Sequence, residues 1–267
     1  MNRALSEKRH WDSFWASRPL PRPIDIHDRS LGNHPHLAFH DYFFSLLKDA
    51  HGKRLIEIGC ASSVRLPYFA REFGIQVTGL DYSEDGCARA RALLRAERVN
   101  GRIVCADMFD PPADLLGAFD IVFSHGLVEH FTDTASTIAT LSRFAKPGAT
   151  LITVVPNLCG IPGFLQRLID RGVYNLHVPL SCKDLLSAHV EAGLKVIDCR
   201  YFLSSHFGVL NTRRPRSERF RTDIKKQALL NLRRCSKLCW LIERYARPLP
   251  SSFLFSPYII CNARMPD

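Results

Sequence analysis

A turn of small residues, EIGCASS, begins at Glu57 and is the first part of the chain whose residue types and spacing could do chemistry. Gly59, Cys60 and Ala61 leave room for a ligand to approach the backbone, and Glu57 places a carboxylate two residues before the glycine. The dinucleotide fingerprint G-x-G-x-x-G, aligned on Gly59, would need glycines where Ala61 and Val64 stand. The turn therefore disfavours a pyrophosphate site, and with it NAD-dependent oxidoreduction.

Two aspartates further along the chain could bind the parts of a nucleoside. Asp81 ends an apolar run about 20 residues after the turn, where a carboxylate can accept both hydroxyls of a ribose. Asp107 comes just after the next apolar run, beside Met108, and is placed to receive an adenine amino group. The two positions predict a nucleoside site next to the turn.

The elements that must position these residues alternate between short apolar strands and helices. The strands are expected at Arg54–Gly59, Ile75–Asp81, Gly101–Cys105, Phe119–Ser124 and Ala149–Val155. The helices are expected at Leu66–Phe73, Glu84–Glu97, Thr134–Lys146, where Pro147-Gly148 stops the helix, and Ser181–Ala192. Continuous apolar strands alternating with helices predict a parallel sheet covered on both faces, and open sheets of this kind bind ligands at the carboxyl edge.

Further elements flank this core. Lys195–Leu203 and Phe253–Arg264 are predicted strands, and Leu37–Ala50 is a predicted helix. An aromatic segment at residues 10–15 predicts a short helix, more often packed on a domain than used as a substrate lid. The uncharged stretch Pro147–Gln166 contains three prolines and three glycines, which favours a buried strand followed by a turn over a bilayer-spanning helix.

From about Leu55 to Arg264 the sequence resembles the class I S-adenosylmethionine-dependent methyltransferases. Five motifs at the family's order and spacing carry the resemblance: EIGCASS, GLDYSEDGCARAR, CADMFDPP, FDIVFSHGLVEHFTD and LSRFAKPGATLITVVPN. It implies an α/β fold with a Rossmann-like seven-stranded sheet, mostly parallel with an antiparallel last strand, and helices on both faces. It also implies an N-terminal helical cap and first helix over 1–50, a methyltransferase domain over 51–267, and a helical insertion at 211–247 between the sixth and seventh strands.

The resemblance also implies a cofactor, S-adenosyl-L-methionine, and the residues that bind it. Glu57 and Gly59 would lie near the methionyl end, Asp81 would bind the ribose, and Ser124 and His125 would line the cofactor next to the transferred methyl. The full set implied is Glu57, Gly59, Cys60, Ala61, Asp81, Tyr82, Asp107, Met108, Ser124 and His125. Ala61 and Ser63 stand where the family usually has glycine, which keeps open a methyltransferase-like scaffold without catalysis.

A general base for the acceptor is expected to be a histidine, because its pKa lies near neutrality. His177 is the first choice, since it follows the fifth strand at the carboxyl edge, and His125 is the second. Glu129-His130 is interpreted as a packing or capping pair at least as readily as a catalytic one. No Cys/His cluster has zinc spacing, so no metal site is predicted.

The acceptor is expected to be a small molecule, methylated on oxygen or nitrogen in specialised or cofactor metabolism. No Asn/Asp/Ser-Pro-Pro-Tyr/Phe motif follows the fourth strand, and no paired catalytic cysteines are present. Methylation of nucleic-acid bases is therefore the less favoured alternative.

The formal net charge of +10 is concentrated in residues 211–247, which hold twelve basic and three acidic residues. An apolar stripe is expected at Ile224, Ala228, Leu232, Cys235, Cys239 and Ile242, with arginine and lysine on the other face. Such a helix most simply packs on the domain with its charges solvated. It could also cap an anionic acceptor, and contact of residues 222–245 with a membrane surface or nucleic acid is the least favoured alternative.

The compartment is expected to be the cytoplasm. Nine scattered cysteines form no disulfide framework, and the first residues contain no apolar signal segment. Neither feature indicates an oligomeric state.

Overall fold

The computed structural model describes residues 4–6, 8–16, 18–212 and 219–267, and for residues 219–226 it describes the backbone alone. In this part of the chain one seven-stranded sheet has the order β3-β2-β1-β4-β5-β7-β6. The strands are β1 Arg54–Ile58, β2 Gln76–Asp81, β3 Gly101–Cys105, β4 Phe119–His125, β5 Ala145–Pro156, β6 Lys195–Phe202 and β7 Tyr258–Arg264. Strands β1 to β5 are parallel and β7 pairs antiparallel with β5 and β6, which confirms the predicted sheet.

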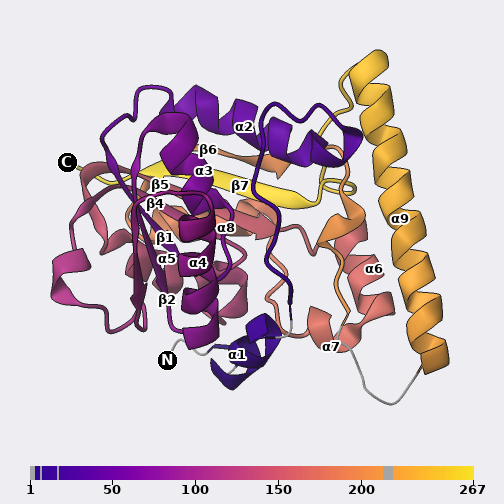
Figure 1. Ribbon diagram of the computed structural model, residues 1–267, viewed down its shortest axis with the longest axis horizontal. Coiled ribbons are helices and arrows are strands. Elements are labelled where there is room, and N and C mark those ends of the chain that lie inside the picture. The colour runs from indigo at the N-terminus through magenta and orange to yellow at the C-terminus, as the bar shows by residue number, and fades with distance from the viewer. Residues whose placement is uncertain (1–3, 7, 17, 213–218) are drawn as a thin grey trace.

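Helices cover both faces of the sheet (Figure 1). The longer ones are α1 Lys8–Ala16, α2 His34–Leu47, α3 Arg65–Phe73, α4 Glu84–Ala96, α5 Thr134–Ser142, α6 Ile161–Ile169, α8 Cys182–Glu191 and α9 Arg219–Tyr245; short turns are η1 Leu31–Asn33, η2 Ala113–Leu115, η3 Val128–His130, α7 Arg171–Tyr174 and η4 Phe207–Val209. Side chains alternate along each strand, so Leu55 joins the apolar cluster under α2, α3 and α4, and Ile56 joins the cluster under α5 and α8.

The helix predicted over Thr134–Lys146 is too long. Helix α5 ends at Ser142, and Pro147 and Gly148 lie inside β5. The register between β4 and β5 shifts here, from Phe119 opposite Ala145 to Ile121 opposite Thr150. The shift marks an irregularity in the hydrogen-bond ladder between β4 and β5. Proline has no N–H to donate, and an irregular part of a strand tolerates it, so Pro147-Gly148 interrupts a strand rather than stopping a helix.

Two boundaries near the end of β5 also differ from the sequence prediction. Strand β7 begins at Tyr258, because the Asn157 amide donates to the carbonyls of Phe253 (2.7 Å) and Ser256 (2.9 Å) and holds the preceding residues in a turn. The stretch predicted to be a turn after β5 contains α6, which begins at Ile161 and has a proline in its first turn, a position that suits proline.

Helix α9 lies between β6 and β7 as predicted, at one edge of the molecule (Figure 1), but its buried face is rotated from the predicted one. Of the predicted stripe, Ala228, Cys235 and Ile242 are exposed, Leu232 and Cys239 are partly buried, and the Ile224 side chain lies outside the described residues. The buried side chains are Leu229, Ser236 and Trp240. The Trp240 Nε1 donates to the Ser205 carbonyl (2.8 Å), and the Ser236 hydroxyl accepts from the Phe207 N–H (2.8 Å). These two hydrogen bonds, which a hydrophobic pattern cannot reveal, set the orientation of the helix.

All nine cysteines are free thiols. Cys235 is exposed and Cys239 is partly buried, so the prediction that they share a core face is wrong for Cys235. Among the described residues, no helix combines the length and the apolar character needed to cross a bilayer.

Candidate active site

The turn after β1 lies at the carboxyl edge of the sheet, where β1, β2 and β4 end side by side. Gly59 has φ +79°, a conformation that favours glycine, and a Cβ there would make a tight 3.1 Å contact with the Leu127 Cδ1 atom. Cys60 and Ala61 are buried behind it. The predicted small-residue turn therefore forms a tight backbone bend at this edge.

Glu57 and Arg65 bring opposite charges to this turn from β1 and from the start of α3. Glu57 is 3% exposed and accepts a hydrogen bond from the Ser63 hydroxyl (2.6 Å). Burial raises the pKa of Glu57 to about 7, although Ser63 and Arg65 both favour the charged form. Arg65 is 6% exposed and its guanidinium carbon lies 4.2 Å from the centre of the Phe39 ring. Among the described residues no carboxylate pairs with Arg65. Arg65 was not identified as a site residue from the sequence.

Asp81 ends β2 with its carboxylate held in place by the backbone. Its Oδ1 accepts from the Ser83 N–H (2.8 Å) and its Oδ2 accepts from the Ala61 N–H (3.0 Å). Burial raises the pKa of Asp81 to about 6, against the lowering effect of these two hydrogen bonds. Each oxygen keeps a second lone pair, so the carboxylate can accept two further hydroxyls. Tyr82, the next residue, is partly buried.

Asp107 and Met108 follow β3 and differ in environment. Asp107 is exposed, and its Oδ1 accepts from the Phe109 N–H (3.0 Å) within the turn that follows β3. Its Oδ2 makes no hydrogen bond within the described residues. Met108 is 5% exposed and packs in the apolar cluster under α5 and α8. A flat ring could therefore lie between the two residues, with the exposed Asp107 on one side and the apolar Met108 on the other.

Ser124 and His125, at the end of β4, point to opposite faces of the sheet. Ser124 is 1% exposed, and its buried hydroxyl has no hydrogen-bond partner in the described part of the chain. The His125 ring lies 5.8 Å from the Phe39 ring and 5.4 Å from the Tyr258 ring. Burial, with Arg65 nearby, lowers the pKa of His125 to about 3. His125 is therefore neutral at pH 7 and a weak base.

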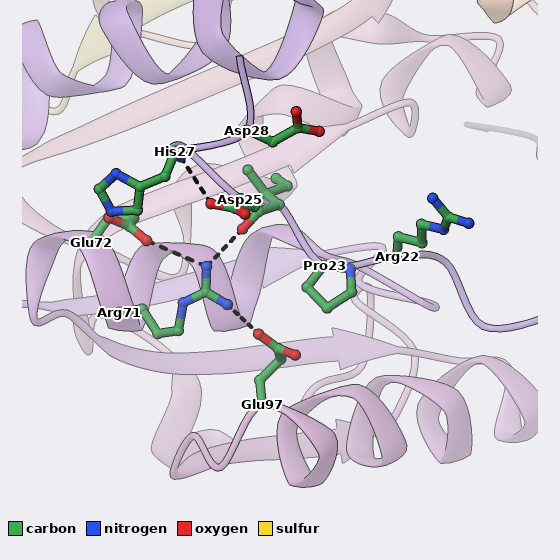
Figure 2. Close-up of a pocket in the computed structure, with 9 residues that line it drawn as sticks. Arg22, Pro23, Asp25, His27, Asp28, Arg71, Glu72 and Glu97 are labelled. Carbon is green, nitrogen blue, oxygen red and sulfur yellow. Dashed lines mark hydrogen bonds and ion pairs between the residues drawn. The ribbon is translucent and has the colours of Figure 1, made fainter. Parts of the chain in front are cut away.

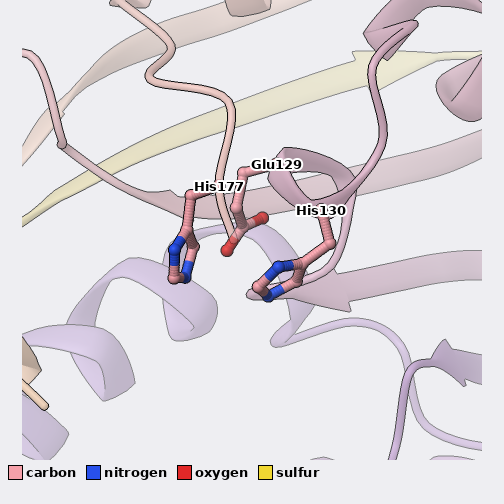
Figure 3. Close-up of side chains that lie close together, drawn as sticks. All are labelled: Glu129, His130 and His177. Carbon is pink, nitrogen blue, oxygen red and sulfur yellow. The ribbon is translucent and has the colours of Figure 1, made fainter. Parts of the chain in front are cut away.

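Three further residues meet beyond the end of β4: Glu129 and His130 from η3, and His177 from the loop after α7 (Figure 3). Glu129 is 1% exposed, and burial raises its pKa to about 8. Burial lowers the pKa of His130 to about 3 and also lowers the pKa of His177. From the sequence, Glu129-His130 was interpreted as a packing or capping pair at least as readily as a catalytic one, and His177 as a separate base, so their convergence was not predicted.

The N-terminal helix α1 lies over this edge. The Asp12 carboxylate accepts from the Ser83 hydroxyl (2.6 Å), two residues beyond Asp81, and Lys8 pairs with Glu84 (2.9 Å). The Trp11 ring meets the His130 ring edge-on, with the centres 4.9 Å apart. Helix α1 thus connects the Asp81 turn to the Glu129–His177 group, and the packing role expected of the aromatic segment is compatible with a cover over the site.

A surface hollow near the C-terminus of α3 lies apart from these residues (Figure 2). Arg71 dominates it, but its guanidinium pairs with Glu97 and Glu72 and donates to the Ile24 carbonyl (2.6 Å). A second hollow lies at the opposite edge of the sheet, beside Lys53 and Arg264. Neither hollow contains a predicted site residue.

Comparisons with known proteins show similarity to methyltransferases. A family model described as "Methyltransferase domain" matches residues 56–153, from β1 to β5. The chain is 28% identical over 204 residues to a ubiquinone biosynthesis O-methyltransferase of Aromatoleum aromaticum, covering 71% of this chain and 79% of the relative. It is 28% identical over 160 residues to the chloroplastic tocopherol O-methyltransferase of Arabidopsis thaliana, covering 55% and 46%.

Among solved structures, the geranyl diphosphate C-methyltransferase of Streptomyces coelicolor A3(2) is similar in fold. That structure was determined with Mg²⁺, geranyl diphosphate and S-adenosyl-L-homocysteine. The TM-score is 0.60 at 14% identity, and the match covers 96% of this chain and 97% of the other. At this identity the likeness concerns the fold alone.

Proposed function

We propose that this chain, which belongs to the class I S-adenosylmethionine-dependent methyltransferases, transfers the methyl group of S-adenosylmethionine to an oxygen or nitrogen of a small-molecule acceptor. The observation that carries the proposal is the convergence of Glu57, Asp81 and Ser124 at one sheet edge under α1. Oxygen is the favoured atom, because the similar proteins from Aromatoleum and Arabidopsis are named O-methyltransferases.

The charges of the site suit the parts of S-adenosylmethionine. Its methionyl end carries an ammonium and a carboxylate, which Glu57 and Arg65 complement, and the positive sulfonium favours the ionised form of the buried Glu57. The free lone pairs of Asp81 accept the two ribose hydroxyls. Asp107 receives the adenine amino group through its Oδ2 atom, and Met108 packs against the ring.

The chemistry asks for alignment more than for strong activation. The acceptor atom forms a bond to the methyl carbon as the carbon–sulfur bond breaks, and the sulfur leaves as a neutral thioether. Alignment of two bound reactants can supply on the order of 7–11 kcal/mol of the barrier. Helix α1 covers the edge of the site through Trp11 and Asp12 and would exclude water from it.

Of the two histidines predicted as a base, His177 is the better supported on the acceptor side. It lies beyond the end of β4 with Glu129, whereas His125 is enclosed by Phe39, Tyr258 and the positively charged Arg65. A base with a pKa near 3 would hold a proton poorly at neutral pH. His125 is therefore proposed to shape the cavity wall rather than to move protons.

Two alternatives from other classes lead to different measurements. A scaffold without catalysis would bind no S-adenosylhomocysteine at millimolar concentration in a calorimetric titration. A nucleic-acid methyltransferase would place the methyl group on RNA or DNA, and its binding would weaken steeply with salt. The exposed basic residues of α9 are the only feature in the described residues that favours the second alternative.

The test is transfer of labelled methyl from S-adenosylmethionine by the full chain. The acceptors are a panel of phenols, catechols and amines, with total RNA and duplex DNA in parallel. The proposal predicts label in a small hydroxyl- or amine-bearing compound and none in nucleic acid. Label in RNA or DNA alone, or no binding of S-adenosylhomocysteine, contradicts it.

A further inference from the structure

Glu129, His130 and His177 bring three potential metal-ligand atoms close together. One ligand atom from each residue can be chosen so that all three lie within 4.8 Å of one another (Figure 3). Two ligands of one ion, each about 2.0–2.2 Å from it, lie roughly 3–4 Å apart, so small rotations of these side chains would bring them into coordination. The rings of His130 and His177 are already adjacent, with their centres 4.5 Å apart.

The backbone fixes which nitrogen of each histidine is available. The His130 Nδ1 lies 2.7 Å from the Leu176 carbonyl, and the His177 Nδ1 lies 2.8 Å from the Val173 carbonyl. A carbonyl only accepts, so each Nδ1 carries the proton and each Nε2 presents a lone pair. Metal-binding histidines are oriented by this kind of contact, in which the second ring nitrogen donates to a carbonyl or carboxylate.

Glu129 supplies the negative charge that such an ion needs. Both of its carboxylate oxygens are buried, and neither has a hydrogen-bond partner in the described part of the chain. An isolated buried carboxylate is strongly disfavoured unless it is neutralised or coordinates a metal. The backbone carbonyl of Glu129 accepts from the Val178 N–H (2.6 Å), which ties η3 to the loop that carries His177.

The group borders the place of methyl transfer. Gly126 directly follows β4, and a Cβ at this position would lie 3.6 Å from the Glu129 Oε1 atom. The next residue, Leu127, packs against Gly59 of the cofactor turn. An ion held here would therefore lie just beyond the end of β4 and beside Trp11 of α1.

From this geometry we propose that Glu129, His130 and His177 bind one divalent first-row transition-metal ion, and that the ion binds the hydroxyl of the acceptor. Two imidazoles and one carboxylate are an established donor set for such ions and leave positions for substrate. The metal site stands on the side-chain geometry, and the contact of the ion with the acceptor rests on the proposed function.

The ion would take over the task assigned above to a base. Metal coordination lowers the pKa of a bound hydroxyl, so the acceptor releases its proton to solvent on binding. The resulting oxygen anion then forms the bond to the methyl carbon, and the sulfur keeps the electron pair of the bond that breaks. His177 becomes a ligand in this assignment rather than a proton acceptor. No metal site was predicted from the sequence, because 47 positions separate His177 from His130.

The test is titration of the full chain with Mn²⁺ after treatment with EDTA, with unbound Mn²⁺ measured by electron paramagnetic resonance. Manganese is the probe because the exposed thiols of Cys105 and Cys235 would bind softer ions. We expect one ion per chain. Glu129→Gln and His177→Ala should each weaken binding by at least about 100-fold, more than loss of an outer-shell contact. The control variants Glu191→Gln and His27→Ala make the same chemical changes at exposed positions and should match the wild type.

Three outcomes overturn the metal site: no Mn²⁺ binding below millimolar concentration, equal binding by the wild type and Glu129→Gln, or equal binding by the wild type and His177→Ala. The His177→Ala variant decides the question if Glu129→Gln does not fold. S-adenosylhomocysteine affinity is measured with and without EDTA in the same preparations. Cofactor binding without Mn²⁺ binding refutes the metal site alone, whereas Mn²⁺ binding without cofactor binding refutes the proposed function.

Discussion

Replacement of Asp81 by asparagine tests the cofactor site at its best-defined contact. The Asp81 oxygens already accept the N–H groups of Ala61 and Ser83, and each can accept one ribose hydroxyl. Hydrogen bonds to a charged group contribute about 1.5–3 kcal/mol each. Asparagine keeps one acceptor oxygen, but its amide nitrogen cannot accept either a hydroxyl or a backbone N–H. We therefore expect a loss of about 2–4 kcal/mol, equivalent to roughly 30- to 1000-fold weaker binding.

The assay is calorimetric titration of S-adenosylhomocysteine into Asp81→Asn and the wild type. Asp110→Asn makes the same chemical change at an exposed position and should bind as the wild type does. Thermal unfolding of each protein without ligand separates lost affinity from lost folding. If folded Asp81→Asn binds within threefold of the wild type, the ribose contact assigned to Asp81 is wrong.

Three other substitutions test separate parts of the account. The raised pKa of Glu57, about 7 against an ordinary 4.5, means that the folded protein binds this proton more tightly than the unfolded chain. The stability contributed by the protonated group is present below pH 4.5 and is lost as pH rises to 7 and above. In urea unfolding, the free energy of unfolding of Glu57→Gln should therefore rise by about 3 kcal/mol relative to that of the wild type between pH 4.5 and 8. A difference between the two proteins that does not change with pH contradicts this. Gly59→Ala should abolish most S-adenosylhomocysteine binding and cost about 1–3 kcal/mol of stability, because it combines a positive φ with a 3.1 Å contact to Leu127; wild-type affinity would show that the turn is not at the ligand. Trp240→Ala should cost about 3–5 kcal/mol in the same urea assay, because the ring is 4% exposed and its N–H is bonded; a cost below 1 kcal/mol would mean that α9 is not held by this residue.

The sheet, and the placement at its carboxyl edge of the residues proposed to bind the cofactor, were predictable because their signals are local. Each strand up to β5 contains an apolar run; Gly59 directly follows β1, Asp81 is the last residue of β2, and Met108 comes three residues after β3. Parallel strands bring their carboxyl ends together, so correct strand positions place these residues at one edge. Errors arose where a local signal had two meanings, as at Pro147-Gly148, which stops helices in general but here sits in the irregular start of β5.

The remaining parts of the site depend on contacts between distant segments. Glu129 meets His177 because the Val178 N–H bonds to the Glu129 carbonyl, a contact with no sequence signature. Arg65 is an ordinary first-turn residue in the sequence, and only its burial against Phe39 reveals a charge without a carboxylate partner among the described residues. The rotation of α9 likewise depends on the hydrogen bond from Trp240 to a distant carbonyl.

A structure of the chain with S-adenosylhomocysteine would locate the cofactor site directly. We expect the ribose on the Asp81 carboxylate, the adenine between Asp107 and Met108, and the homocysteine end between Glu57 and Arg65. Its sulfur should face the end of β4 at Ser124. A ligand bound elsewhere, for example in the hollow around Arg71, or a ribose without contact to Asp81, would contradict the assignment of this edge as the site of methyl transfer.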